Sequence, residues 1–468
     1  MTRRLITVAW LSSSLLVASC AASSSGDGSG GPTSRGDASS DGFVDVSFDA
    51  SPGDSARTDT ASSPGDDTST DPTVDAGPTW GSTCPPGGAP KVSGQVFAPN
   101  GHDPAPASYA YAPISVTPYV PGVACDACDK AIDPFWVQTL TGVDGTFTLD
   151  LTDVPATPTV KIAVRKGRFR KVVTVTPSCA TTTKMPATDT TLPGSTSAGD
   201  LPKIAVSTGN SDHLDTILTA LGITSFSCYE GRVASGALCP AGVASGKKVL
   251  DLLRDATTLD TFNVLLVSCA PNIWSSYSSA DQATIKANLA AWVNKGGRFF
   301  ATDNSYDYVA QTWPDAITWE GAAGPPWPVG TLAGAGANVG VVPSSGSYAA
   351  TVDDPDITAW LKLPEIAVTS APSVSISGWL KPWSVQKSLA TTTTRITHGS
   401  VQFQYPSGSA TTTSDLPLTA KFLVNSCGKV VYSSYHTLSS VSASGLTPQE
   451  RILEYLLLDV ASCVNGIK

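Results

Sequence analysis

Residues 262–303 constrain the fold more than any other stretch, because they read as a strand, a helix and a second strand. Val264 to Val267 is a short apolar run, typical of a strand that is buried on both faces. Apolar side chains then recur at helical spacing from Ile285 to Val293, and a Gly-Gly pair follows that can end a helix. Arg298 to Thr302 is the second strand. Two strands joined by a helix predict parallel pairing with a right-handed crossover.

The carboxyl ends of parallel strands are where open α/β sheets bind ligands, which makes Cys269, Asp303 and His436 candidate site residues. Cys269 and Asp303 follow the two strands above, and His436 follows a later predicted strand. An Asp–His pair there can act as a general base. The alternative is that Asp303 caps the next helix, His436 is bonded within a loop and Cys269 is a buried thiol. We expect this structural alternative and assign no catalytic residue.

The first twenty residues have the pattern of an export signal. Two arginines precede an apolar stretch from Leu5 to Val17 that is too short to cross a bilayer. The sequence Val-Ala-Ser-Cys at positions 17–20 resembles a bacterial lipobox. That resemblance implies that residues 1–19 are a signal peptide and that Cys20 carries the lipid, palmitate included, which anchors the protein to the membrane. The alanine after Cys20 implies the outer membrane of a bacterial cell envelope, outside the cytoplasm.

Residues 20–82 are predicted to be a disordered tether, since Ser, Gly, Asp, Thr and Pro leave little to bury. Its eleven aspartates against two arginines account for most of the net charge of −10. The rest of the chain is close to neutral and shows no basic patch, so a nucleic acid is not expected as a partner. The partners we expect are the membrane, through Cys20, and an envelope glycan or protein.

Short strands with turn signals between them are predicted for residues 83–180 and favour an antiparallel β-sandwich. The pattern VSGQVFAPNG, TGVDGTFTLDLTDVP and VKIAVRKGRFRKVVTV resembles the carboxypeptidase-regulatory-like domain, a small transthyretin-like sandwich. This resemblance implies a structural or adhesive module. Residues 107–137 form a longer insertion than the pattern needs, and residues 181–200 read as a linker.

Residues 201–468 predict an α/β domain. The segments IAVSTGNSDHLDTILTALGI, FNVLLVSC, GGRFFATDNSY and CGKVVYSSYHT resemble the class I glutamine-amidotransferase-like fold in its degenerate ThuA-like form. That resemblance implies a flavodoxin-like three-layer domain, so the chain is expected to be multidomain. A Trp-rich insertion around 312–400 reads as irregular, and a capped helix begins at Thr447. The complete order of segments is similar to a set of myxobacterial lipoproteins.

The catalytic pattern of the amidotransferases is not matched. Their nucleophilic Cys follows the strand that here ends at Thr302, where this chain has Asp303. Their His is followed two residues later by Glu, whereas His436 is followed by Leu438. A Cys nucleophile needs a base and that base needs an orienting acid, so glutamine hydrolysis is not expected. We expect a non-catalytic binding or structural lipoprotein without cofactor or metal. The alternative is a hydrolase or sugar-modifying enzyme built on Asp303 and His436.

Nine cysteines follow Cys20, and an oxidising compartment favours disulfides among them. The Cys125-x-x-Cys128 motif has three interpretations: a redox centre, part of a zinc site with Cys84 and Cys179, or a structural disulfide. We expect the structural disulfide. The expected pairs are Cys125–Cys128, Cys84–Cys179, Cys228–Cys239 and Cys427–Cys463, which leaves Cys269 unpaired.

Six tryptophans lie in or near the insertion, and they can either line a carbohydrate groove or pack the insertion. We expect packing, because large aromatic rings dominate cores as readily as binding surfaces. The six are Trp313, Trp319, Trp327, Trp360, Trp379 and Trp383.

Overall fold

The computed structural model describes residues 77–86, 88, 90–125, 133–209, 212–231, 247–270, 273–329, 340, 346–379, 383–404, 409–437 and 445–461. These residues belong to one compact unit. Cys20 and nearly all of the predicted tether lie outside them, as do Cys128, Cys239 and Cys463. Within the described ranges, every helix is too short or too polar to cross a membrane.

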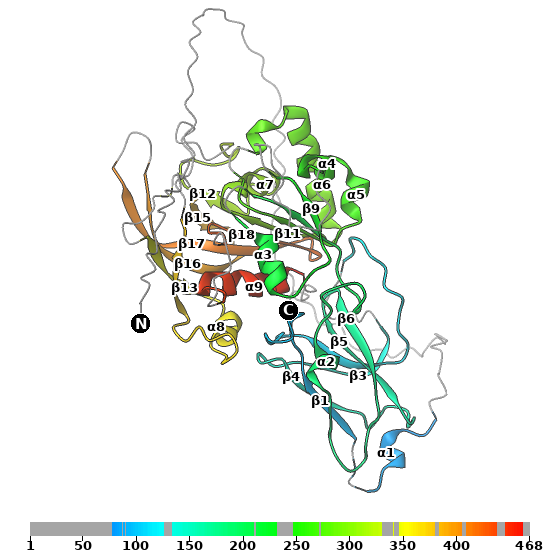
Figure 1. Ribbon diagram of the computed structural model, residues 1–468. Coiled ribbons are helices and arrows are strands. Elements are labelled where there is room, and N and C mark those ends of the chain that lie inside the picture. Colours follow the sequence, from blue (N-terminus) through cyan, green and yellow to red (C-terminus); the bar gives the residue numbers. More distant parts are fainter. Residues whose placement is uncertain are drawn as a thin grey trace, which may run out of the picture. The chain divides into compact units, whose positions relative to one another are not determined.

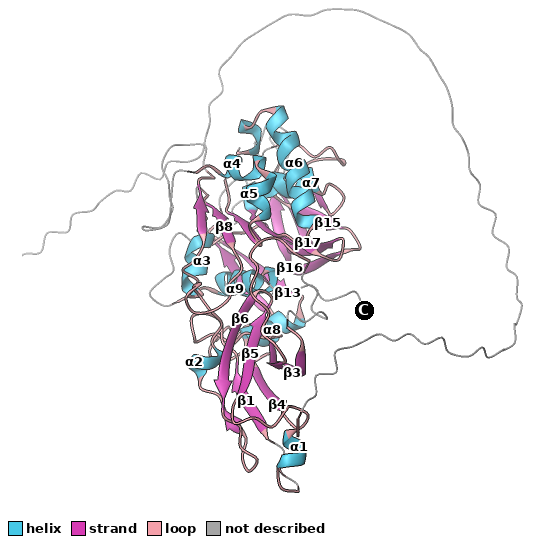
Figure 2. Ribbon diagram, turned by 90° about the vertical axis from the view of Figure 1, so that its right-hand side faces the viewer, coloured by secondary structure: helices cyan, strands magenta, loops and turns pink. Residues whose placement is uncertain are grey.

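Two small sheets make up the first region (Figure 1, Figure 2). A short helix, α1 (Trp80–Thr83), precedes them. One sheet has the order β4-β1-β7, with β1 Lys91–Gln95, β4 Thr146–Asp150 and β7 Thr183–Lys184. The other has the order β3-β2-β5-β6, with β2 Tyr109–Pro113, β3 Phe135–Leu140, β5 Val160–Lys166 and β6 Phe169–Val175. Every pairing is antiparallel except that of β1 with β7.

Two parts of this region differ from the sequence prediction. Strand β2 and the beginning of β3 lie in the stretch 107–137 that reads as an insertion. β2 was not recognised because it is buried along most of its length and so lacks an alternating pattern. The predicted linker 181–200 contributes β7 and helix α2 (Ala187–Thr190). It is held there because Met185 and Leu192 are buried in the core, so it is part of the packed structure.

A nine-stranded mixed sheet organises the second region, in the order β14-β13-β16-β17-β18-β11-β10-β8-β9. The five strands from β18 to β9 are parallel, and β10 and β11 pair as the sequence predicts. The remaining strands extend the sheet by antiparallel pairing. Their bounds are β8 Ile204–Ser207, β9 Ser227–Tyr229, β10 Val264–Val267, β11 Arg298–Thr302, β13 Ser347–Val352, β14 Ser373–Ser377, β16 Thr393–Phe403, β17 Thr411–Val424 and β18 Gly428–Ser433.

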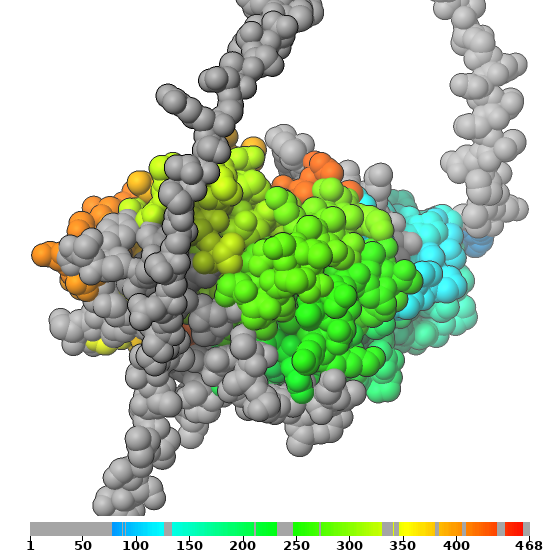
Figure 3. All heavy atoms as spheres, turned by 90° about the horizontal axis from the view of Figure 1, so that it is seen from above, coloured from blue at the N-terminus to red at the C-terminus, as the bar shows by residue number. Residues whose placement is uncertain are grey.

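Alternate residues of the parallel strands face two different apolar clusters. Leu266 and Phe300 belong to an apolar cluster that also contains residues of the helices α3 (Leu214–Ala220), α8 (Pro355–Leu361) and α9 (Pro448–Val460). Leu265 and Phe299 belong to the cluster of the opposite layer, whose outer surface is green in Figure 3. That layer contains α4 (Val249–Arg254), α5 (Ala256–Asp260), α6 (Ser279–Asn294) and α7 (Tyr306–Thr312).

The N-cap of α9 is the residue that the sequence predicts, whereas the N-cap of α6 lies one residue before the predicted one. Thr447 and Glu450 form the predicted capping box of α9. For α6, the spacing of Ser279 and Gln282 in the sequence predicts Ser279 as the N-cap. Ser279 is already helical, however, and Ser278 caps the helix by accepting from the Asp281 N–H. Two adjacent serines offer the same chemistry, so composition alone cannot choose between them.

The Trp-rich insertion is not irregular, which corrects the sequence prediction. It supplies β13, β14 and most of β16 to the large sheet, and a separate pair of strands, β12 (Ile317–Trp319) and β15 (Gln386–Leu389). The strands are rich in Ser and Thr, which weakens the apolar signal. Trp319, Trp360 and Trp383 are completely buried, so the expectation that these rings pack the fold is confirmed.

The stretch 119–125 lies along the amino ends of the parallel strands. The Tyr119 hydroxyl donates to the Leu201 carbonyl at 2.6 Å, and Val123 N–H donates to the Asp260 carbonyl at 2.8 Å. A disulfide then joins Cys125 to Cys427, with 4.9 Å between their Cα atoms. The amino edge of the sheet is therefore covered by the first region, and the candidate site residues follow the opposite, carboxyl edge.

The disulfide predictions are partly right. Cys84 pairs with Cys179, which confirms one of them. The Cys125–Cys427 bond shows that the predicted pairs of Cys125 with Cys128 and of Cys427 with Cys463 are wrong, and its 302-residue separation explains why no local spacing indicated it. Cys228 is disulfide-bonded, and its predicted partner Cys239 lies outside the described residues. Cys269 is free and buried, as predicted.

Candidate functional site

Polar side chains gather at the carboxyl ends of the parallel strands. Cys269 follows β10, Asp303 follows β11, and His436 follows β18. Cys269 Sγ donates to Asp303 Oδ2 at 3.3 Å, and His436 lies close enough to act electrostatically on the Asp303 carboxyl. The fold thus brings together the three residues that the sequence singles out. All three are buried, with 1% of Asp303, 2% of Cys269 and 6% of His436 exposed.

Asp303 occupies a strained turn between β11 and α7. Its φ of +38° is in the left-handed region, which a residue with a side chain adopts at a cost. Oδ1 of its carboxylate accepts from the Ser384 N–H at 3.1 Å, and its carbonyl accepts from the Tyr432 hydroxyl at 2.9 Å. The expectation that Asp303 caps the following helix is therefore wrong, because its carboxylate bonds to Ser384 and Cys269 instead.

Burial sets the protonation of this cluster. It raises the pKa of Asp303 to about 7, against the opposing effect of His436. Burial, helped by the neighbouring carboxylate of Asp303, raises the pKa of the Cys269 thiol well above its usual value. A thiol that stays protonated is a poor nucleophile, since the thiolate is the reactive form.

Asp212 is a member of the cluster that sequence reasoning missed. Its Oδ1 accepts from the Thr437 N–H at 2.9 Å, the Thr437 hydroxyl at 2.7 Å and the His213 N–H at 2.9 Å. Its Oδ2 accepts from the Thr302 hydroxyl and, at 3.3 Å, from the Cys269 N–H. An aspartate after a strand can equally begin a helix, and only the fold shows that this one ties several strand ends together.

His436 is oriented by its own loop. Its Nδ1 lies 2.8 Å from the Thr437 carbonyl, so Nδ1 carries the proton in that bond. Its backbone carbonyl accepts from Gln449 Nε2 at 3.0 Å. The second ring nitrogen of His436, Nε2, is buried and has no hydrogen-bond partner among the described residues. This Nε2 has a free lone pair, so it can accept a proton from another group.

The structure gives less support to a metal site or to a tryptophan-lined carbohydrate groove. The described residues contain no group of three or more His, Cys, Asp or Glu side chains arranged to hold a metal ion. The Trp319, Trp360 and Trp383 rings are in the core and line no groove. Two surface pockets of about 370 Å³ each lie in the first region, on either side of α2.

Comparisons with known proteins do not assign the chain: no family model matches it, and no curated protein matches it either.

Proposed function

We propose that this protein is a lipid-anchored lipoprotein of the bacterial cell envelope, facing away from the cytoplasm, and that it is a non-catalytic binding or structural protein. Its anchor is the lipid on Cys20, its membrane the outer membrane, and its partner an envelope glycan or protein. The disulfides Cys84–Cys179 and Cys125–Cys427 support an oxidising compartment.

The proposed architecture is a carboxypeptidase-regulatory-like sandwich followed by a flavodoxin-like, degenerate ThuA-like domain. The two small sheets of the first region support the sandwich. In chain order, the parallel strands β9-β8-β10-β11-β18 have the order 2-1-3-4-5, which is the flavodoxin-like order. Helices that pack against both apolar faces of these strands support three layers.

The non-catalytic proposal is carried by the bonds that already engage the candidate nucleophile Cys269 and the carboxylates around it. The Cys269 thiol is bonded to Asp303, and five donors bond to Asp212. The Cys269 thiol has a raised pKa, and the carboxylates of Asp303 and Asp212 already accept hydrogen bonds from protein donors. Together these groups form a buried polar network that holds the strand ends in place.

A second candidate, a hydrolase or sugar-modifying enzyme, is favoured by one feature. Asp303 adopts a left-handed turn between strand and helix, and the unpartnered Nε2 of His436 belongs to the same cluster. Strained residues of this kind cluster at active sites. In such an enzyme His436 would be the base and Asp303 its acidic partner.

One experiment separates the two candidates. The full chain is incubated with fragments of bacterial cell wall, and its melting temperature and the release of products are followed. We expect saturable stabilisation without product, equal in wild type and His436→Ala. His102→Ala, a change at an exposed histidine of the first region, is the control. Product formation that disappears in Asp303→Asn with His436→Ala would overturn the non-catalytic proposal.

A further inference from the structure

An interruption in the edge of β1 provides a backbone site that the fold does not use. The Ser93 carbonyl accepts from the Met185 N–H at 2.8 Å, which ends the pairing of β1 with β7. Pairing resumes where Phe97 N–H donates to the Thr190 carbonyl at 3.3 Å. Between these two bonds the chain leaves the strand to form α2, so Gln95 faces a gap one residue wide.

The register shows where the backbone of Gln95 points. Gln95 lies opposite Thr146 on β4. The next residue, Val96, donates its N–H to the Gly145 carbonyl at 2.8 Å, and a bond at this position shows that Gln95 and Thr146 are a non-hydrogen-bonded pair. In such a pair both backbone groups point away from the partner strand. The N–H and C=O of Gln95 therefore face α2, and no described residue bonds to either.

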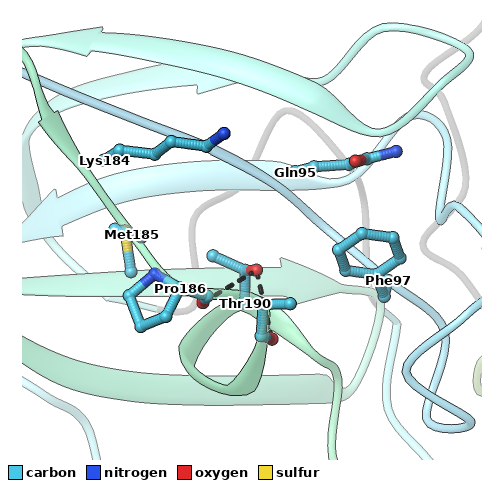
Figure 4. A pocket seen from close by; sticks show the side chains of 7 residues that line it. Gln95, Phe97, Lys184, Met185, Pro186 and Thr190 are labelled. Atoms are coloured by element: carbon cyan, nitrogen blue, oxygen red, sulfur yellow. Dashed lines mark hydrogen bonds between the residues drawn. The ribbon is translucent and has the colours of Figure 1, made fainter.

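A pocket of about 370 Å³ opens at this gap (Figure 4). Figure 4 shows Lys184 and Gln95 along one side, with Pro186 and Thr190 across from them. Lys184 is exposed, and none of the acidic groups in the described ranges forms an ion pair with it. Most of the lining is apolar, and its residues are Gln95, Phe97, Lys184, Met185, Pro186, Ala187 and Thr190.

We propose that the Gln95 gap binds the carboxyl-terminal residue of a peptide. The terminal carboxylate accepts a hydrogen bond from the Gln95 N–H and pairs with the Lys184 ammonium. The terminal apolar side chain packs against Phe97 and Met185. Capture of a carboxylate by backbone N–H groups is an established mode of peptide recognition, and charge assistance strengthens it.

The width of the gap selects a chain end over an internal segment. Bonds at Ser93 and at Phe97 close the gap on both sides, so a strand running through it can pair with Gln95 alone. A chain end needs only that one residue, and its charge complements Lys184. The pocket is near the lower limit for ligand sites, which suits one side chain better than a larger ligand. This inference rests on the proposed binding function and gives it a ligand class.

The test uses the full chain and acetyl-Ala-Ala-Leu in two forms, with a free carboxylate and as the amide, in titration calorimetry. We expect saturable binding of the free acid and binding weaker by about tenfold for the amide. Lys184→Glu should weaken the free acid by at least about tenfold, and Lys161→Glu, the same change at another exposed lysine, should leave it unaltered. Ala187→Trp, which fills the pocket, should also abolish binding.

Hydrogen exchange adds a readout at the backbone itself. The Gln95 amide should exchange fast in the free protein and slowly with the free-acid peptide, while Gly94 on the β4 side stays unchanged. Equal affinity for acid and amide, no effect of Lys184→Glu, or no saturable binding would each overturn the proposal. Such a failure is distinguishable from failure of the proposed function, because lipid attachment and localisation are measured independently.

Discussion

Replacing Asp303 by Asn should remove the pH dependence of stability that the burial of this carboxyl causes. Asparagine keeps the shape, accepts from the Ser384 N–H through Oδ1, and tolerates the left-handed φ of +38° better than most residues. The substitution therefore removes the charge and little else, apart from the bond to Cys269, which an amide N–H can replace.

The direction of this pH dependence follows from the protons that the folded and unfolded states bind. The pKa of Asp303 is raised from an ordinary 3.8 to about 7, so the folded state holds a proton that the unfolded state loses. This stabilising contribution is complete below about pH 4 and is lost as the pH rises through about 7. A shift of about three pH units corresponds to about 4 kcal/mol, so Asp303→Asn should be more stable than wild type by up to about 4 kcal/mol at pH 8.

Urea unfolding followed by tryptophan fluorescence at pH 4 to 8 measures this difference. At pH 8 the midpoint of Asp303→Asn should lie about 1 M above that of wild type, and the two should converge near pH 4. Asp315→Asn, a change at an exposed aspartate, is the control and should follow wild type at every pH. If the midpoints of wild type and Asp303→Asn change in parallel across this pH range, burial does not raise the pKa of Asp303.

Three further changes test the rest of the structure. Replacing Cys125 and Cys427 by Ser removes a link across 302 residues and should lower the free energy of unfolding by about 4 kcal/mol. Equal stability of the wild-type protein with and without reductant would contradict this. Arg170→Met leaves the buried Asp133 without its 2.6 Å partner and should cost about 3 to 5 kcal/mol in chemical unfolding, and a cost below about 1 kcal/mol would count against a buried pair. Thr447→Ala should cost about 1 kcal/mol in thermal unfolding through the lost cap, and an unchanged melting temperature would show that the cap is not needed.

The sequence predicted the parts of the fold that local signals determine. Apolar runs such as Val264 to Val267 indicated the parallel strands, because strands buried on both faces are continuously apolar. The Thr447 capping box was found because all of its partners lie within four residues. Cys269, Asp303 and His436 were singled out because strand ends of a parallel sheet meet at one edge.

What could not be predicted depends on contacts between distant residues. The bond between Cys125 and Cys427 and the position of Asp212 among strand ends have no local pattern. Strand β2 was not predicted because both of its faces are largely covered, so its sequence does not alternate. Strand β13 was not predicted because its Ser and Thr residues are typical of a loop. The gap at Gln95 is a property of register, which a one-residue shift would change completely.

Mass spectrometry of the amino-terminal peptide, with the full-length gene expressed in a bacterial host, tests whether the protein is lipid-anchored outside the cytoplasm. If the proposal is right, the mature chain begins at Cys20 with acyl chains attached, and Cys20→Ala abolishes both the lipid and the membrane association. A chain that keeps Met1, or one that begins at Cys20 or later without a lipid, would contradict it.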